Sequence, residues 1–401
     1  MDKLPVDAGA ETPIRRSAFL KDVFICAQGA YGGPESHFGV FMDQLVARRR
    51  YLGEEELVEL LALCSVIPGP TSTQTIVAVG YKLGGPVLAA LTMAVWALPA
   101  IVIMGAISFL YGFLEGRDAS MGFMRFVGPA ALGFILVAAL RIGRKVVTDR
   151  LTAALMLAGA TFCYFVRAPW AFPAALLAGG AITFAAGAGK RTWVGLELRP
   201  PWGYLAAFGL LAVAAVAMGA ATGSPLARLF EAFYRFGYLV FGGGQVVVPL
   251  MHGELVGLHG YLSHEEFMTG YGLVQAVPGP MFSFAAYAGG MATRGGGALY
   301  QAAGAAVAGA SIFLPGILLI FFVYPIWNGL KKLEAIKAAL RGIGAVAGGL
   351  MALAAVILAQ ADGFRPSTLA AAALSAAAMA GGRIPAPLIV AAALAAGFLI
   401  P

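Results

Sequence analysis

Long apolar blocks follow one another along most of this chain, with short polar or charged stretches between them. A helix needs about 20 apolar residues to cross the ~30 Å hydrocarbon core of a bilayer. The pattern therefore predicts an all-α integral membrane protein with many spans. The predicted spans are residues 87–111, 126–140, 151–166, 171–187, 204–221, 298–324, 343–359, 369–380 and 388–400.

Four further blocks are apolar but are interrupted by Gly and Pro, at about residues 19–50, 54–82, 229–257 and 264–293. A helix break that faces lipid leaves backbone groups without hydrogen-bond partners, so such breaks belong in the protein interior or beside a cavity. We therefore expect these blocks to form broken or re-entrant helices.

The broken blocks occur in pairs, because the sequence matches itself when it is shifted by 210 positions. The matched motifs are Gly32-Gly33 with Gly242-Gly243, Tyr51-Leu52 with Tyr261-Leu262, and Pro68-Gly69-Pro70 with Pro278-Gly279-Pro280. A set of matches at one offset predicts two homologous halves. The expected parts are a disordered cytoplasmic tail at 1–17, a first repeat at 18–190, a linker with one membrane helix at 191–225, and a second repeat at 226–401.

The few charged residues indicate how the two halves are oriented. Only 12% of the residues are charged and 60% are hydrophobic, which excludes a soluble protein of this length. The basic cluster Arg48-Arg49-Arg50 has no basic counterpart in the second half, whereas Lys331, Lys332 and Lys337 correspond to a nearly neutral loop of the first. By the positive-inside rule, the halves form inverted-topology repeats, with the N-terminus in the cytoplasm and the C-terminus in the periplasm. Cytoplasmic loops then account for the net charge of +7, and no nucleic-acid partner is expected.

The two Pro-Gly-Pro motifs are the main candidate site. Each motif ends one predicted helix and begins another. The free N–H groups at a helix start carry the positive end of the helix dipole and bind anions, and two inverted helix starts converge near the midplane. The candidate residues are Pro68, Gly69, Pro70, Thr71, Ser72, Thr73 and Gln74, with Pro278, Gly279, Pro280 and Ser283. The simpler interpretation is that the Thr and Ser side chains only cap their helices.

A second pair of breaks contains consecutive glycines. These residues are Gly32, Gly33 and Pro34 in the first half, and Gly242, Gly243, Gly244 and Gln245 in the second. Backbone N–H groups without neighbouring side chains can form an anion-binding nest. We expect both segments to line the same site, with Gln275 adjacent. The alternative is close helix packing, which small residues permit.

The remaining polar residues favour structural roles. Glu265 and Glu266 follow Ser263 in the pattern of a capping box, which indicates helix-start charge. His37 stands alone in an apolar block, and we interpret it as structural. No metal-ligand spacing, cofactor motif or nucleophile motif is present, so we expect no metal, no cofactor and no enzyme activity.

The motifs taken together resemble the chromate ion transporter family over nearly the full chain. The resemblance is carried by Tyr31-Gly32-Gly33-Pro34, by Arg48-Arg49-Arg50-Tyr51-Leu52, by both Pro-Gly-Pro motifs and by Gln275. It implies a bacterial inner-membrane antiporter that exports chromate, driven by the proton gradient, through alternating access. The implied partners are chromate or a similar oxyanion, protons and the lipid bilayer, and a homodimer is left open.

Two other functions stay open at this point. Sulfate and molybdate share the shape and charge of chromate, so the sequence does not separate carriers for these anions. A membrane scaffold without transport of its own is the second alternative.

Overall fold

The structure is a computed structural model of the chain, and it describes residues 15–115, 121–166, 168, 170–187, 199–240, 247–330 and 333–400. Helices make up most of this described part of the chain, and no strand occurs in it. The prediction of an all-helical protein is thereby confirmed. A helix satisfies its own backbone hydrogen bonds, as an apolar environment requires.

The first half begins with short helices and continues with longer ones. Its elements are α1 (Arg16–Gly29), α2 (Pro34–Phe41), η1 (Met42–Arg48), α3 (Glu54–Val66), α4 (Thr71–Glu115), η2 (Met121–Met124), α5 (Val127–Val146), α6 (Arg150–Val166) and α7 (Ala171–Ala186). α4 consists of two helices, residues 71–83 and 86–115, because the backbone of Gly84 and Gly85 is not helical. Gly85 has φ 70°, a conformation that other residues rarely adopt.

The second half repeats the order of these elements after the connecting helix α8 (Trp202–Thr222). It starts with α9 (Pro225–Tyr238), α10 (Val248–His252), η5 (Gly253–Leu258), α11 (His264–Val274), η6 (Met281–Ser283), α12 (Phe284–Ala292) and η7 (Arg294–Gly296). It ends with α13 (Ala298–Ser311), α14 (Leu314–Val323), η8 (Tyr324–Ile326), α15 (Trp327–Leu330), α16 (Glu334–Ala361), α17 (Pro366–Ala380) and α18 (Ala386–Leu399). The two π-helical segments, η1 and η5, occupy matching places in the two series.

Within the described residues, five helical segments are long and apolar enough to cross a membrane. They are 71–115, 121–146, 202–222, 298–330 and 337–361. Four apolar helices of 10–17 residues, α6, α7, α17 and α18, accompany them. These lengths and compositions fit a multi-pass membrane protein. The predicted span 298–324 is divided, since α13 ends at Ser311 and α14 begins at Leu314.

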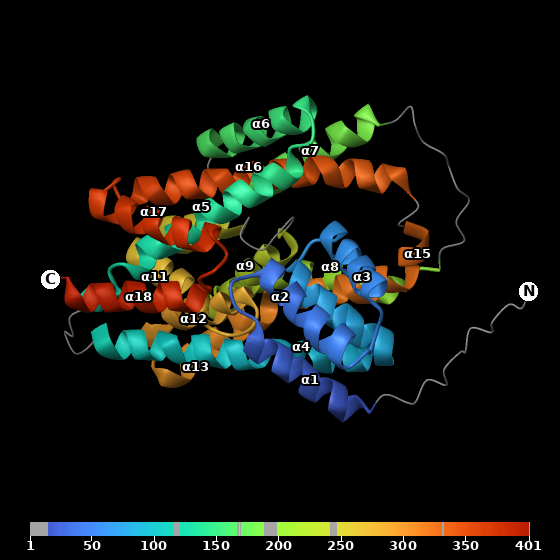
Figure 1. The fold of residues 1–401 in the computed structure, drawn as a ribbon, viewed down its shortest axis with the longest axis horizontal. Coiled ribbons are helices and arrows are strands. Elements are labelled where there is room, and N and C mark those ends of the chain that lie inside the picture. Colours follow the sequence, from blue (N-terminus) through green and yellow to red (C-terminus); the bar gives the residue numbers. More distant parts are fainter. Residues whose placement is uncertain are drawn as a thin grey trace, which may run out of the picture.

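Glycine allows the two halves to pack closely. α16 of the second half packs on α5, α6 and α7 of the first, and α5, α6 and α16 run side by side along the top of Figure 1. A Cβ atom on Gly342 of α16 would collide with the carbonyl oxygen of Gly179 in α7. A Cβ atom on Gly349 would likewise collide with the carbonyl oxygen of Met156 in α6. Much of the scattered glycine therefore serves close helix contact, as small residues do in membrane bundles.

The broken helices of the two halves occupy different ends of the molecule. α1 and α3 lie toward the right-hand end of Figure 1, while α11 and α12 lie toward the left-hand end. α18 ends at that left-hand end, far from the start of α1. The motifs that interrupt these helices meet between the two ends, and the candidate site is there.

Candidate functional site

Both Pro-Gly-Pro motifs are breaks in the helical backbone. α3 ends at Val66 and α4 begins at Thr71, while α11 ends at Val274 and η6 begins at Met281. The central glycines adopt left-handed backbone angles, with φ 136° at Gly69 and φ 112° at Gly279. A side chain would strain either position. Only glycine therefore allows this path of the chain at low cost.

The two motifs are joined to the opposite half by matching backbone hydrogen bonds. The amide of Gly69 donates to the carbonyl oxygen of Val240 over 2.8 Å, and the amide of Gly279 donates to that of Ala30, also over 2.8 Å. Donors and acceptors are both related by the 210-residue shift of the sequence repeat. The first Pro-Gly-Pro break is therefore bonded to the chain just after α9, and the second break is bonded to the chain just after α1.

One narrow cavity lies between the two motifs. It is lined by His37, by Pro70, Thr71, Ser72 and Thr73 of the first half, and by Pro280, Met281 and Phe282 of the second. The cavity contains about 260 Å³ of empty space, most of it in gaps narrower than a water molecule. The structure thus brings the two predicted helix starts together around one closed space.

The start of α4 presents backbone donors to this cavity. The first intrahelical bond of this segment runs from the Gln74 amide to the Pro70 carbonyl. The amides of Thr71, Ser72 and Thr73 therefore have no acceptor within the helix. They carry the positive end of the dipole of a 13-residue helix, residues 71–83. The side chains of Ser72 and Thr73 are buried at this point. The arrangement is suited to an anion.

His37, which the sequence interpretation treated as structural, lines this cavity. Its Nδ1 atom lies 3.0 Å from Ser72 Oγ, and its ring packs edge-on against Trp96 at 5.4 Å between ring centroids. Only 1% of the residue is exposed, and the buried Nε2 atom has no hydrogen-bond partner in the described part of the chain. His37 lies in the first turn of α2, directly after the break at Gly32-Gly33. That position beside a predicted break was the available signal.

Trp96 also fixes the start of α4. Its Nε1 atom donates to Thr73 Oγ1 over 3.2 Å. Because that oxygen accepts from the indole, the Thr73 hydroxyl keeps its own proton available for donation. The Trp96 side chain is fully buried against His37 and Phe41.

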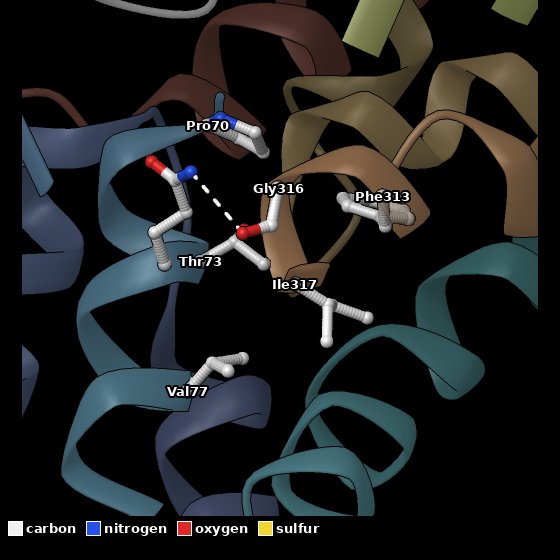
Figure 2. Close-up of a pocket in the computed structure, with 7 residues that line it drawn as sticks. Pro70, Thr73, Val77, Phe313, Gly316 and Ile317 are labelled. Atoms are coloured by element: carbon white, nitrogen blue, oxygen red, sulfur yellow. Dashed lines mark hydrogen bonds between the residues drawn. The ribbon is translucent and has the colours of Figure 1, made fainter. Parts of the chain in front are cut away.

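Gln74 stabilises the break and lines a second, neighbouring cavity. Its Nε2 atom donates to the Pro68 carbonyl over 2.8 Å. The same atom reaches the Gly316 carbonyl at 3.4 Å, which is the dashed line in Figure 2. This cavity is lined by Pro70, Thr73, Gln74, Val77, Phe313, Gly316 and Ile317. The first half of the chain contributes α4 to it and the second half contributes α14. Gln74 therefore supports the motif rather than facing the space between the two Pro-Gly-Pro breaks.

Gln275 and Ser283 are buried beside the second motif with unsatisfied polar atoms. Both ends of the Gln275 side-chain amide and the Ser283 hydroxyl lack a partner among the described residues. Neither residue lines the two cavities above. Buried polar atoms without partners are uncommon, and a strained, catalytic or ion-binding position accounts for many of them. Pro68, Gly69, Pro278 and Gly279 form the bends themselves and are also absent from the two linings.

The structure describes the first glycine-rich segment and not the second. Gly32 and Gly33 have φ 75° and φ 104°, so the chain breaks there as predicted. Neither lines the two cavities, and a Cβ atom on Gly32 would face Ala386 of α18 at 3.7 Å. The Pro34 side chain and residues Gly242, Gly243, Gly244 and Gln245 lie outside the described part of the chain.

Glu266, at the start of α11, has the capping role that was predicted, and Glu56 has a matching ion pair at the start of α3. Ser263 Oγ accepts from the Glu266 amide over 3.1 Å, and Glu266 Oε2 accepts from the Ser263 amide over 2.7 Å, which is a capping box. Glu266 also pairs with Arg294, as Glu56 pairs with Lys82 in the first half. Each ion pair links the two helical segments that flank a Pro-Gly-Pro break, at their ends away from the break.

Among the described residues, no charged side chain lines the cavity between the motifs. The buried charges of the described residues are paired elsewhere: Asp22 with Arg49, Gln44 and Tyr51, and Arg235 with Glu231 and Glu254. An anion in this cavity would therefore be held by backbone amides, hydroxyls and the His37 ring, with helix dipoles as the fixed source of positive potential.

The fold and this closed, donor-lined cavity define a multi-pass membrane protein with a candidate anion site between two homologous helix breaks. The chain belongs to the chromate transporter family: the family model described as Chromate transporter matches residues 18–184 and 227–398. It is 28% identical over 343 residues to the chromate transport protein of Cupriavidus metallidurans, which covers 82% of this chain and 79% of that protein. It is 27% identical over 329 residues to the probable chromate transport protein of Synechococcus elongatus, covering 82% and 80%. No solved structure matches the chain.

Proposed function

We propose that this protein exports chromate, a tetrahedral dianion, across the bacterial inner membrane, driven by the proton gradient. The names of its relatives support chromate as the substrate. The observation that carries the proposal is the single cavity whose walls come from both Pro-Gly-Pro helix starts. Amide and hydroxyl donors around a closed space suit an anion with four acceptor oxygens.

The proposed architecture is an inverted repeat, with residues 18–190 and 226–401 as the two units. The division is supported by the two separate matches to the family model. It is also supported by the reciprocal bonds from Gly69 to Val240 and from Gly279 to Ala30, which are related by a two-fold exchange of the halves. Such symmetry around a midplane site is the plan of many secondary transporters.

Contacts between the halves support termini on opposite faces, and the positive-inside rule then assigns the N-terminus to the cytoplasm. Arg341 pairs with Asp149, so two segments that the proposal assigns to the cytoplasmic face lie together. Arg294 lies 3.9 Å from Glu115, and Arg125 bonds to the Ile400 carbonyl, both at the proposed periplasmic face. An arrangement with parallel halves would place the partners of these pairs on opposite sides.

Transport would proceed by alternating access, with the closed cavity as the occluded form. A tetrahedral oxyanion needs more room than the present gaps, so one pair of broken helices must move away from the other to admit it. The amide bonds from Gly69 and Gly279 cross between the halves beside the cavity, and opening to one side would break one of them.

Chromate flux in proteoliposomes that contain the purified full chain tests the proposal. We expect chromate uptake that an imposed pH gradient accelerates. If the site recognises only the shape and charge of the anion, sulfate or molybdate should compete with chromate. A carrier specific for sulfate or molybdate would transport that anion and leave chromate outside. Empty-liposome rates for all three anions would identify a scaffold without transport of its own.

A further inference from the structure

We propose that His37 is a substrate-linked protonation site: it is neutral in the empty cavity and takes up one proton when the oxyanion binds. The inference rests on the proposed function and concerns the same site: a proton taken up with the anion balances its charge and travels with it, so it does not itself drive export. Three observations on the described residues carry it: the Nε2 atom has no partner among them, none of them places a charged side chain in the cavity lining, and the Ser72 hydroxyl lies at Nδ1.

The charge of the ligand is not balanced by the backbone alone. Each helix N-terminus is equivalent to roughly +0.5 elementary charge, so the two starts at Thr71 and Met281 offset about half of the charge of a dianion. An unbalanced charge in a buried space is costly, and proteins avoid it by pairing or by proton uptake. An imidazolium at His37 would supply the missing positive charge.

The geometry around His37 suits both protonation states. In the neutral ring, Ser72 donates its hydroxyl proton to Nδ1, and the proton of the ring is at Nε2. When a proton from solution is added at Nδ1, that atom donates to Ser72 Oγ across the same 3.0 Å contact. Nε2–H then donates to the anion, and the Ser72 hydroxyl proton is released to donate into the cavity. The only covalent change is the new Nδ1–H bond, which is formed with the proton taken from solution.

No other described group competes for this role. α2 packs on α1, η1 and α4, and the facing part of the second half, Met281 and Phe282, is apolar. No charged side chain of the described residues acts on His37. Four charged groups of those elements form ion pairs: Asp22 with Arg49, Asp43 with Arg48, Lys82 with Glu56, and Glu115 with Arg294. Two tyrosines pack against other rings, Tyr81 against Tyr324 and Tyr111 against Tyr287. Lys21 is exposed on the surface, and Cys26 is buried in α1.

Titration calorimetry on the purified full chain in detergent tests the inference. Chromate, and separately sulfate, is titrated at about pH 8 in Tris and in HEPES, two buffers with different ionisation enthalpies; at this pH free histidine is neutral. We expect the wild type to take up about one proton per anion with either probe. Sulfate is included because it stays a dianion near neutral pH, so any proton taken up with it belongs to the protein.

Variants assign the proton to one residue. H37Q keeps a neutral donor, so it should still bind while proton uptake vanishes and the affinity becomes independent of pH. The wild-type affinity should fall about tenfold for each unit of rising pH. H259Q changes an exposed histidine that stacks on Tyr261, and it should behave as wild type. H37N serves as a second test if H37Q is not monodisperse in size-exclusion chromatography.

The possible failures are distinguishable. Binding by the wild type without proton uptake would overturn the role of His37 and leave the proposed function intact. Unchanged uptake in H37Q or H37N would place the proton on another group and overturn it as well. Failure of the wild type to bind either anion would reject the proposed function, and the inference with it.

Discussion

The backbone amide of Gly69 donates a hydrogen bond to the carbonyl of Val240, although 171 residues separate them in the sequence. The same bond recurs between Gly279 and Ala30, with donor and acceptor halves exchanged. A sequence duplication therefore has a counterpart in the hydrogen-bonding of the two motifs. These reciprocal bonds place the starts of two broken helices on one cavity, and the predictions below depend on that placement.

Replacing the central glycine of either Pro-Gly-Pro motif by alanine should destabilise the protein. G69A and G279A force a residue with a side chain into a left-handed conformation, which costs about 1–3 kcal/mol. The new Cβ atom would also collide with Gln74 in the first case and lie 2.9 Å from Ala100 Cβ in the second. Thermal unfolding in detergent measures the effect. G39A is the matched control, because Gly39 lies inside α2 with open space around it; an equal loss in G39A would contradict the explanation.

Removing the positive charge of Arg235 should destabilise the second half strongly. Arg235 binds Glu254 through both terminal nitrogens, at 2.6 and 2.9 Å, and Glu254 is 3% exposed. R235M leaves this carboxylate buried without its partner, which typically costs about 3–5 kcal/mol. The double variant R235M/E254Q should recover part of the loss. R48A breaks an exposed ion pair with Asp43 and should cost about 1 kcal/mol or less.

The termini should lie on opposite sides of the inner membrane. Fluorescent and alkaline phosphatase reporters fused to each end measure this in cells. The N-terminal fusion should be active as a cytoplasmic reporter and the C-terminal fusion as a periplasmic one. Activity of both ends on one side would refute the inverted repeat, whatever the substrate proves to be.

Removing the Ser72 hydroxyl should slow chromate transport. S72A deletes a donor at the start of α4 and the partner of His37, and a lost hydrogen bond to a charged ligand costs about 1.5–3 kcal/mol. The expected effect is a roughly tenfold to hundredfold lower rate at low chromate in proteoliposomes. S65A removes an exposed hydroxyl that only bonds to the Leu61 carbonyl in α3, and its rate should match the wild type. Equal rates for S72A and S65A would remove Ser72 from the site.

The sequence predicted the helical class, the long spans and the two breaks at Pro-Gly-Pro, because these features depend on local composition. Apolar blocks require helices in lipid, and proline with glycine in tandem interrupts them. Thr71, Ser72 and Thr73 line one cavity together with Pro280, as the repeat led us to expect. Orientation, boundaries of the units and direction of transport stay predictions.

What the sequence did not reveal depends on contacts between distant segments. His37 was interpreted as structural because its partners, Ser72 and Trp96, come from another helix. Gln74 was expected in the site, yet its amide reaches back to Pro68. The 210-residue shift aligns Lys82 with the uncharged Ala292, but Arg294, two residues further on, binds Glu266 as Lys82 binds Glu56. Ring orientation, side-chain direction and small shifts in register are set by packing, which a single sequence does not display.

Anomalous diffraction from crystals grown with chromate tests the central claim most directly. The chromium signal would locate the anion without reference to any assumed residue. We predict a peak between the first turn of α4, at Ser72 and Thr73, and the start of η6 at Met281, within contact distance of His37. A peak confined to another place, such as the cavity between α8 and α9 at Arg235, would contradict the account.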